Sequence, residues 1–209
     1  MATQRDVDAA LATSHGIDRA VDRAWFARDA LVVARALIGC RLVYARGDGD
    51  VRVARIVETE AYRGPRDRAC HARAGLTKRT RSLLGEEGHA YVFLVYGMHD
   101  CFNVTCAQAG AGHAVLVRAG EPLSGFEGRV DLGGPGLFAR GLGITRAQDG
   151  HDLTLAPLYL CGRSTRPSIG VTARVGVGYA GAWAERPWRF LDRNSLAVSR
   201  PAARLIGRG

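Results

Sequence analysis

The chain has 209 residues, of which 47% are hydrophobic and 23% are charged. This length fits one domain with a buried core, and the ordinary charged fraction excludes a largely disordered chain. The formal net charge of +9 suggests a polyanionic partner, although 28 of the 29 basic residues are arginine, a bias that a GC-rich genome explains equally well.

The first part of the sequence predicts a helix followed by two strands. Residues 1–24 are rich in alanine, aspartate and arginine and are interpreted as a helical or frayed leader. Asp29 is placed to cap a short helix, and Gly39 is placed to end it. Two strands are expected between residues 41 and 59, separated by a glycine-flanked turn at 47–49.

A long basic loop follows at residues 63–81. It is polar and interrupted by Gly and Pro, and only Asp67 opposes its basic side chains, so its net charge is +6. These basic residues are Arg63, Arg66, Arg68, Arg73, Lys78, Arg79 and Arg81. Loops of this length inside a domain are usually functional or disordered. The tail from Cys161 onward is a second basic zone, with nine arginines against two acidic residues.

The rest of the sequence predicts a hairpin and several separate elements. Residues 90–95 and 101–105 are typical of paired strands, joined by a turn at 96–99 with an aromatic residue near its tip. The other expected elements are a strand at 114–118, a helix at 135–144 that begins with Pro135, and a strand at 172–177. We therefore predict an α+β fold with a single domain over residues 25–209, built around a curved, mostly antiparallel β-sheet.

The cysteines indicate a reducing compartment. The five cysteines are Cys40, Cys70, Cys101, Cys106 and Cys161. Their spacing matches no zinc or iron–sulfur site, and their odd number indicates free thiols, so we expect no metal and a cytoplasmic location. No signal-peptide pattern is visible, and no segment approaches the roughly 20 apolar residues of a membrane span, so no membrane partner is expected.

Glu58 and Glu60 end the second predicted strand, beside the basic loop. Alternate residues of a regular strand share a face, so the two carboxylates are expected to lie together. A carboxylate beside a cationic groove suits a general base that activates water, although strand ends are often charged and paired with arginine without any catalysis. His71 follows Cys70 in the loop, but neighbours rarely form a working Cys–His pair, so contact with phosphate or backbone is the simpler interpretation.

Tyr62, Phe93 and Tyr96 surround the same region. Aromatic residues on strands usually belong to the core. Their association with arginines also fits a surface that holds unstacked bases. An aromatic wedge on a hairpin can in addition enter the minor groove of DNA.

Several short segments occur in an order and spacing that resemble one protein family. These segments are Val57–Tyr62, Gly64–Pro65 with His71, Ala90–His99, Asn103, Val115–Leu123, Gly134–Leu137 and Val177–Gly181. The chain thereby resembles the alkyladenine DNA glycosylases, also called 3-methyladenine or N-methylpurine DNA glycosylases, over about residues 31–191. Each segment alone is weak evidence, whereas the ordered set is specific.

The resemblance implies a monofunctional DNA glycosylase of base excision repair. Such an enzyme inserts a protruding β-hairpin into the minor groove and flips an alkylated or deaminated purine out of the duplex. A Glu-activated water then hydrolyses the N-glycosidic bond. The implied partner is double-stranded DNA containing damaged purines. The enzyme is expected to be a monomer without cofactor or metal, in a bacterial-type cytoplasm and on the nucleoid when it acts.

The resemblance also assigns roles to individual residues. Glu60 corresponds to the general base and Arg118 to the residue beside the catalytic water. The pocket for the flipped base corresponds to Tyr62, His71, Phe93, Asn103 and Leu116. Tyr96 corresponds to the wedge, with Met98 near it. The basic loop adds expected DNA contacts at Arg73, Lys78, Arg79 and Arg81.

Two positions depart from the family pattern. Phe93 replaces the usual Tyr, which keeps the stacking ring but removes a hydroxyl contact. Glu86 and Glu87 occupy a turn that is usually less acidic, and nothing in the sequence explains them.

Two other functional classes stay open from the residues alone. One is a non-catalytic, basic nucleic-acid-binding module, which would gain nothing from the carboxylate of Glu60. The other is a metal-dependent nuclease, which would need several carboxylates converging on Mg²⁺. The sequence offers Glu58 and Glu60 for that purpose but no clear third ligand.

Overall fold

The computed structural model describes residues 19–47, 49–163 and 166–199. The α-helices within these ranges are α2 (Ala30–Leu37) and α3 (Pro135–Leu142), and short 3₁₀ helices are η1 (Arg23–Trp25), η2 (Gly64–Arg66), η3 (His71–Ala74), η4 (Arg146–Gln148) and η5 (Gly178–Trp183). The strands are β1 (Arg41–Ala45), β2 (Val51–Arg63), β3 (Ala90–Val95), β4 (His99–Cys106), β5 (His113–Ser124), β6 (Leu158–Cys161), β7 (Ile169–Thr172) and β8 (Arg189–Asp192).

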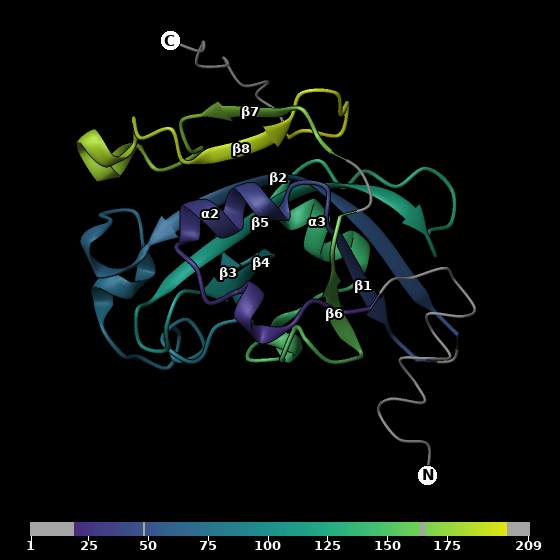
Figure 1. Ribbon diagram of the computed structural model, residues 1–209, viewed down its shortest axis with the longest axis horizontal. Coiled ribbons are helices and arrows are strands. Elements are labelled where there is room, and N and C mark those ends of the chain that lie inside the picture. The colour runs from purple at the N-terminus through teal and green to yellow at the C-terminus, as the bar shows by residue number, and fades with distance from the viewer. Residues whose placement is uncertain (1–18, 48, 164–165, 200–209) are drawn as a thin grey trace.

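The strands form one curled sheet, and every pairing among the described strands is antiparallel. The order is β3-β4-β5-β2-β1-β6, with β8 joined to β2 and β7 joined to β8. Figure 1 shows the sheet curling around the helices, while β7 and β8 lie along β2. The predicted α+β class and the curved, antiparallel, single-domain architecture are confirmed.

The first predicted helix forms as expected. Asp29 accepts a hydrogen bond from the backbone N–H of Leu31 at 2.9 Å, which satisfies one of the free donors at the start of α2. Gly39 follows the helix with a φ of +89°, a value that favours glycine. The helix packs against β2 and β5, and α3 packs against β4 and β5. Both helices contribute buried residues to the main hydrophobic core, such as Leu37 and Phe138.

The central strand is β2, and it positions the candidate site. Along one edge it pairs with β5. Along the other edge it pairs first with β1, at Val51–Arg55, and then with β8, at 58–60. The pairing with β5 shifts register on both sides of Glu58. The two glutamates therefore lie where β2 changes partner and its regular pairing with β5 is interrupted.

The late strand predicted at 172–177 is wrong beyond its first residue, because β7 covers Ile169–Thr172. After Thr172 the backbone leaves the sheet: the N–H of Val175 donates to the side chain of Glu60 instead of to a neighbouring strand. The following Gly176 has a φ of +74°, which a regular strand does not allow. Strands β6 and β8, each four residues long, were not predicted.

The predicted leader lies mostly outside the described residues, which begin at residue 19. Within its described end, Ala20 forms a β-bridge with Cys161, and the N–H of Val21 donates to the carbonyl of Leu160 at 2.9 Å. The segment just before α2 is therefore attached to the sheet at β6.

Candidate active site

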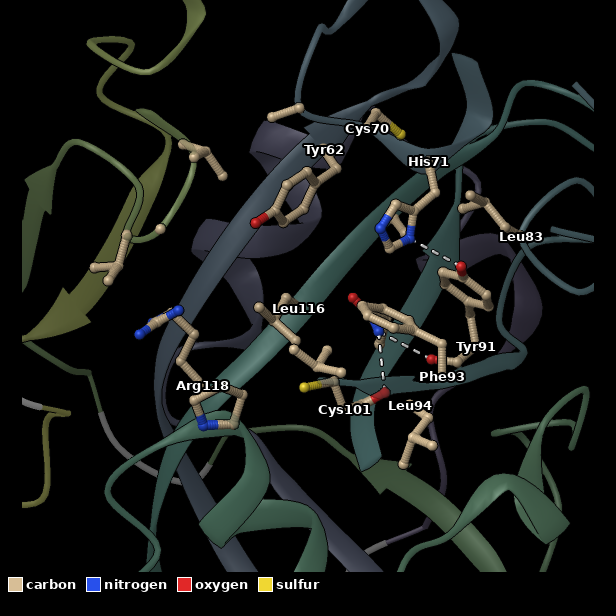
Figure 2. Close-up of a pocket in the computed structure, with 18 of the residues that line it drawn as sticks. Tyr62, Cys70, His71, Leu83, Tyr91, Phe93, Leu94, Cys101, Leu116 and Arg118 are labelled. Carbon is tan, nitrogen blue, oxygen red and sulfur yellow. Dashed lines mark hydrogen bonds between the residues drawn. The ribbon is translucent and has the colours of Figure 1, made fainter. Parts of the chain in front are cut away.

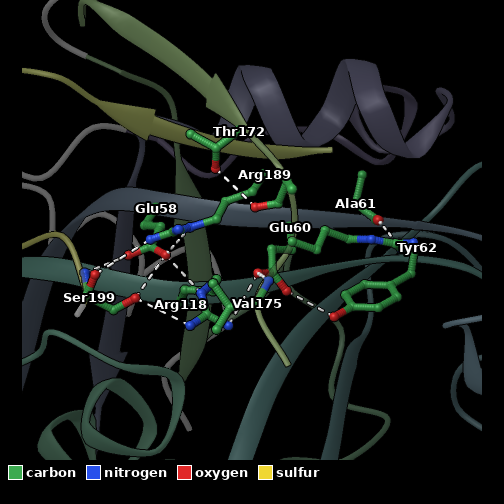
Figure 3. A network of polar contacts seen from close by, with 11 residues as sticks. Glu58, Glu60, Ala61, Tyr62, Arg118, Thr172, Val175, Arg189 and Ser199 are labelled. Atoms are coloured by element: carbon green, nitrogen blue, oxygen red, sulfur yellow. Dashed lines mark hydrogen bonds and ion pairs between the residues drawn. The ribbon is translucent and has the colours of Figure 1, made fainter. Parts of the chain in front are cut away.

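Two buried glutamates converge on one arginine. Arg118 on β5 donates through Nε to Oε1 of Glu58 at 2.7 Å, and one of its terminal nitrogens lies 3.3 Å from Oε1 of Glu60 (Figure 3). Both glutamate side chains are fully buried. The two carboxylates therefore share a face of β2, as the alternation of the strand predicts.

Glu58 has a full set of donors. Besides Arg118 it accepts from Nε of Arg189 at 2.6 Å, and from the backbone N–H and the hydroxyl of Ser199 at 2.6 and 2.9 Å. A carboxylate with this many charge-assisted and backbone bonds is held in one geometry. Glu58 thus ties β2 and β5 to the segment that follows β8, and it holds Arg118 in place.

Glu60 has fewer donors, and they come from residues that line a cavity. The hydroxyl of Tyr62 donates to Oε2 at 2.9 Å, and the backbone N–H of Val175 donates to Oε1 at 2.7 Å. Burial raises the pKa of Glu60, while the charge of Arg118 and these two hydrogen bonds lower it. A carboxyl group whose pKa is raised is a stronger proton acceptor once it is ionised, which suits a general base.

Tyr62, Arg118 and Val175 line a cavity beside Glu60, although Glu60 itself is buried and is not part of the lining. The cavity has a volume of about 470 Å³ and mostly aromatic and aliphatic walls (Figure 2). This falls within the range of about 300–1,000 Å³ that is usual for small-molecule sites. Arg118 lines this cavity, and so do all five predicted pocket residues, which are Tyr62, His71, Phe93, Asn103 and Leu116. They come from β2, η3, β3, β4 and β5, so the fold brings together residues that are far apart in the sequence. We call this space the aromatic cavity.

One wall of the aromatic cavity is a ring cluster. The His71 ring meets the edge of Phe93 at a centroid distance of 4.6 Å, and Tyr91 lies 5.2 Å from Phe93. Nδ1 of His71 lies 3.0 Å from the hydroxyl of Tyr91. Burial and the nearby charge of Arg79 lower the pKa of His71 to about 4. His71 is therefore neutral near pH 7 and presents an uncharged polar ring to the cavity.

Tyr62 forms the opposite side of the cavity in Figure 2, across from His71 and Phe93, and Leu116 lies below Tyr62 in this view. The guanidinium of Arg174 lies over the Tyr62 ring, 4.7 Å from its centroid. The ring is thus held by a cation–π contact and by the hydrogen bond of its hydroxyl to Glu60.

The amide of Asn103 has a fixed orientation. Its Nδ2 donates to the carbonyls of Tyr91 at 3.0 Å and of Cys101 at 3.3 Å. A flipped amide would set its oxygen against two carbonyl oxygens, so the network determines the assignment. The remaining polar atom of this cavity-lining residue is Oδ1, a hydrogen-bond acceptor.

The hairpin of β3 and β4 carries an exposed aromatic ring at its tip. Val95 pairs with His99, and the intervening Tyr96 and Met98 are 87% and 72% exposed. Tyr96 has a φ of +51° and is followed by Gly97 at +70°, so the turn uses a backbone conformation that is unusual for tyrosine. Tyr96 also lines the aromatic cavity, which places the exposed ring beside it.

The basic loop presents its cations to solvent. Arg73, Lys78, Arg79 and Arg81 are all exposed. The only acidic residue of the loop, Asp67, is buried and accepts from Arg174 at 2.6 and 2.9 Å. Its charge therefore does not neutralise the exposed side chains of the loop.

The second basic zone, in the tail, is only in part a surface feature. Arg174 and Arg189 are both buried and make ion pairs with Asp67 and Glu58. These two arginines hold buried carboxylates next to the site, so their charges are not exposed for binding.

The sequence did not identify four residues that shape the site: Tyr91, Arg174, Val175 and Tyr179. Tyr91 and Tyr179 lie in the segments that carried the family resemblance, which was the signal available for them. Arg174 and Val175 gave no signal, because they reach Asp67 and Glu60 only through the folded chain.

Among the described residues, no three His, Cys, Asp or Glu side chains lie close enough to hold a metal ion. The five cysteines are free and buried. Burial raises the pKa of the two thiols that line the aromatic cavity, Cys70 and Cys101, to about 11. In the part of the chain that the structure describes, no helix has the length and apolar character needed to cross a membrane.

Comparison with known proteins gives consistent matches. Residues 24–196 match the family model of methylpurine-DNA glycosylase. A Myxococcus xanthus protein is 49% identical over 178 residues, which cover 84% of this chain and 91% of the relative. An Anaeromyxobacter dehalogenans protein is 50% identical over 182 residues, or 86% of each chain, and a Methanocella arvoryzae protein is 44% identical over 192 residues, covering 86% of this chain and 96% of the relative. All three carry the name "Putative 3-methyladenine DNA glycosylase".

Proposed function

Because the chain belongs to the methylpurine-DNA glycosylase family, whose members hydrolyse N-glycosyl bonds in DNA, we propose that it flips a damaged purine out of the duplex and cleaves its bond to the sugar with a water activated by Glu60. One observation carries this mechanism. The buried carboxylate of Glu60 is bonded to Tyr62, Arg118 and Val175, all of which line the aromatic cavity.

The aromatic cavity holds the flipped base. A purine alkylated on a ring nitrogen carries positive charge, and electron-rich rings attract it through cation–π contacts. Tyr62 on one side and His71 with Phe93 on the other supply such rings. His71 is neutral near pH 7, so it adds no positive charge against the base. The acceptor Oδ1 of Asn103 disfavours bases that bring a second acceptor to that position.

The hydrolysis needs little beyond a positioned water and one carboxylate. Glu60 takes a proton from the water, and the oxygen attacks C1′ while the bond to the purine nitrogen breaks with its electron pair leaving on the base. An alkylated base leaves as a neutral molecule, which makes it a good leaving group. The charge of Arg118 lowers the pKa of Glu60 and so favours its ionised form, and the ion pair orients the carboxylate.

The hairpin and the basic loop hold the DNA. Tyr96 enters the space that the flipped nucleotide leaves, and Met98 contacts the neighbouring base pairs. The exposed cations of the loop, Arg73, Lys78, Arg79 and Arg81, attract the DNA backbone. We further propose that the protein acts as a monomer.

Release of free base separates this proposal from its alternatives. The enzyme is incubated with a duplex that carries one damaged purine, with and without EDTA, and the free base and the DNA strand are analysed. We expect equal base release in both conditions, an intact abasic strand and no borohydride-trapped adduct, because a Schiff base needs an amine and Lys78 is the only lysine. EDTA-sensitive strand cleavage would instead indicate a nuclease, binding without release would indicate a binding module, and an adduct lost in Lys78→Ala would indicate a strand-cleaving glycosylase.

A further inference from the structure

A second, smaller cavity opens beside the aromatic one. Its volume is about 270 Å³, and it shares part of its lining with the aromatic cavity, including His71, Arg79 and Tyr179. Two further arginines line only the second cavity, Arg68 and Arg73. We call this space the arginine cavity. The shared lining residues show that the two cavities adjoin.

Within the described residues, no carboxylate neutralises the positive charge of the arginine cavity. None of the three arginines forms an ion pair with a carboxylate in the described part of the chain. The nearest acidic residue in sequence, Asp67, is turned inward to Arg174. The neutral state of His71 adds no charge near pH 7. The three arginines that line the cavity therefore have no carboxylate partner among the described residues.

The segment that carries Arg79 is held in one conformation. The hydroxyl of Thr80 donates to the carbonyl of Gly75 at 2.6 Å, and the N–H of Thr77 donates to the same hydroxyl at 2.8 Å. Arg79 lies between these threonines, with its guanidinium 4.9 Å from the centroid of the Phe93 ring. A guanidinium that is held in advance loses less entropy when it binds an anion.

We propose that the arginine cavity binds one backbone phosphate directly beside the flipped nucleotide; this rests on the proposed function. A phosphodiester is the anion whose oxygens match the planar fork of arginine. A flipped nucleotide that fills the aromatic cavity with its base leaves its sugar and adjoining phosphates outside that cavity, and the arginine cavity is its neighbour. Lys78 and Arg81 belong to the same loop but line neither cavity, so they serve only general attraction to DNA.

The test is a double-mutant cycle between arginine and phosphate. Duplexes carry one damaged purine and a single neutral methylphosphonate, moved one position at a time across the phosphates that flank it. For the wild-type protein we expect one position at which the methylphosphonate weakens binding by roughly 10- to 100-fold. In Arg68→Ala and Arg73→Ala, a methylphosphonate at that position should weaken binding little further, because the arginine that contacts this phosphate is already absent.

Lys78→Ala and Arg81→Ala are matched controls, since each also removes one exposed positive charge from the loop. In both controls the methylphosphonate effect stays as large as in the wild type. If the methylphosphonate weakened binding by the same factor in all four variants as in the wild type, the phosphate site would be overturned. Base release from the same duplexes reports separately on the proposed function: its absence, with the cycle intact, would overturn hydrolysis and leave the phosphate site supported.

Discussion

At the scale of single residues, Glu58 and Glu60 show how environment separates two identical side chains. Both are buried and both contact Arg118. Glu58 is also bonded to Arg189 and Ser199, residues more than 130 positions away in the sequence. Glu60 is bonded to residues that line the aromatic cavity. The sequence predicted that the two would lie together, but only the folded partners distinguish a structural carboxylate from a candidate base.

The pH dependence of Arg118→Gln tests the coupling of Arg118 to Glu60. Glu60 must be ionised to accept a proton, so activity falls as the pH drops through its pKa. Burial raises this pKa, and Arg118 opposes the rise. Removal of the positive charge raises the pKa further, so we expect the acid limb of the pH–rate profile to move to higher pH.

The measurement is single-turnover excision of a neutral damaged base over a range of pH. Arg189→Gln is the matched control, because Arg189 forms its ion pair with Glu58 rather than Glu60. Its acid limb should stay close to that of the wild type. An acid limb that stays in place in Arg118→Gln, or moves to lower pH, would contradict the coupling.

At the scale of elements, the sequence predicted those segments whose pattern is local. The β-branched run of β2, the hairpin of β3 and β4, and the Asp29 cap of α2 are all present. It missed β6 and β8, because four-residue strands carry little periodicity and are stabilised by pairing with distant segments. The strand predicted at 172–177 was wrong for a related reason: Val175 bonds to a side chain rather than to a strand.

The hairpin tip is the element on which the proposed base flipping depends most directly. Tyr96 is 87% exposed and has a positive φ, so its ring is held outward at a backbone cost that the core does not explain. Loss of base–aromatic stacking costs ~1–3 kcal/mol. We therefore expect Tyr96→Ala to reduce excision from duplex DNA by roughly 5- to 150-fold. The loss should be smaller on single-stranded DNA, which has no base stack to hold open.

Tyr96→Phe is the control, because it keeps the ring and should retain most of the duplex activity. Melting temperatures are measured for both variants alongside excision from matched duplex and single-stranded substrates. An exposed side chain contributes little to stability, so neither substitution should lower the melting temperature by much. Equal losses of Tyr96→Ala on the two substrates, together with a melting temperature several degrees lower, would show that Tyr96 is structural.

At the scale of the whole molecule, the long strand β2 connects the parts of the site. It pairs with β5, which carries Arg118, and with β8, which carries Arg189, at the positions of the two glutamates. The sequence predicted the strand and the surrounding charge but not this change of partners. Among the described residues, buried arginines are paired with acids behind the site, while the arginines of the loop face solvent. The fold thereby separates the arginines that support the site from those available to DNA.

The central claim is that Glu60 activates the water. The most direct test measures single-turnover release of a damaged purine from duplex DNA by Glu60→Gln and by Glu58→Gln, with binding to the same DNA and melting temperature recorded for each. We expect Glu60→Gln to lose on the order of 10²–10⁴-fold in release while binding is largely retained. Glu58→Gln should lower the melting temperature but still release base. Release by Glu60→Gln at a rate near that of the wild type at neutral pH, with the loss found in Glu58→Gln instead, would contradict the account.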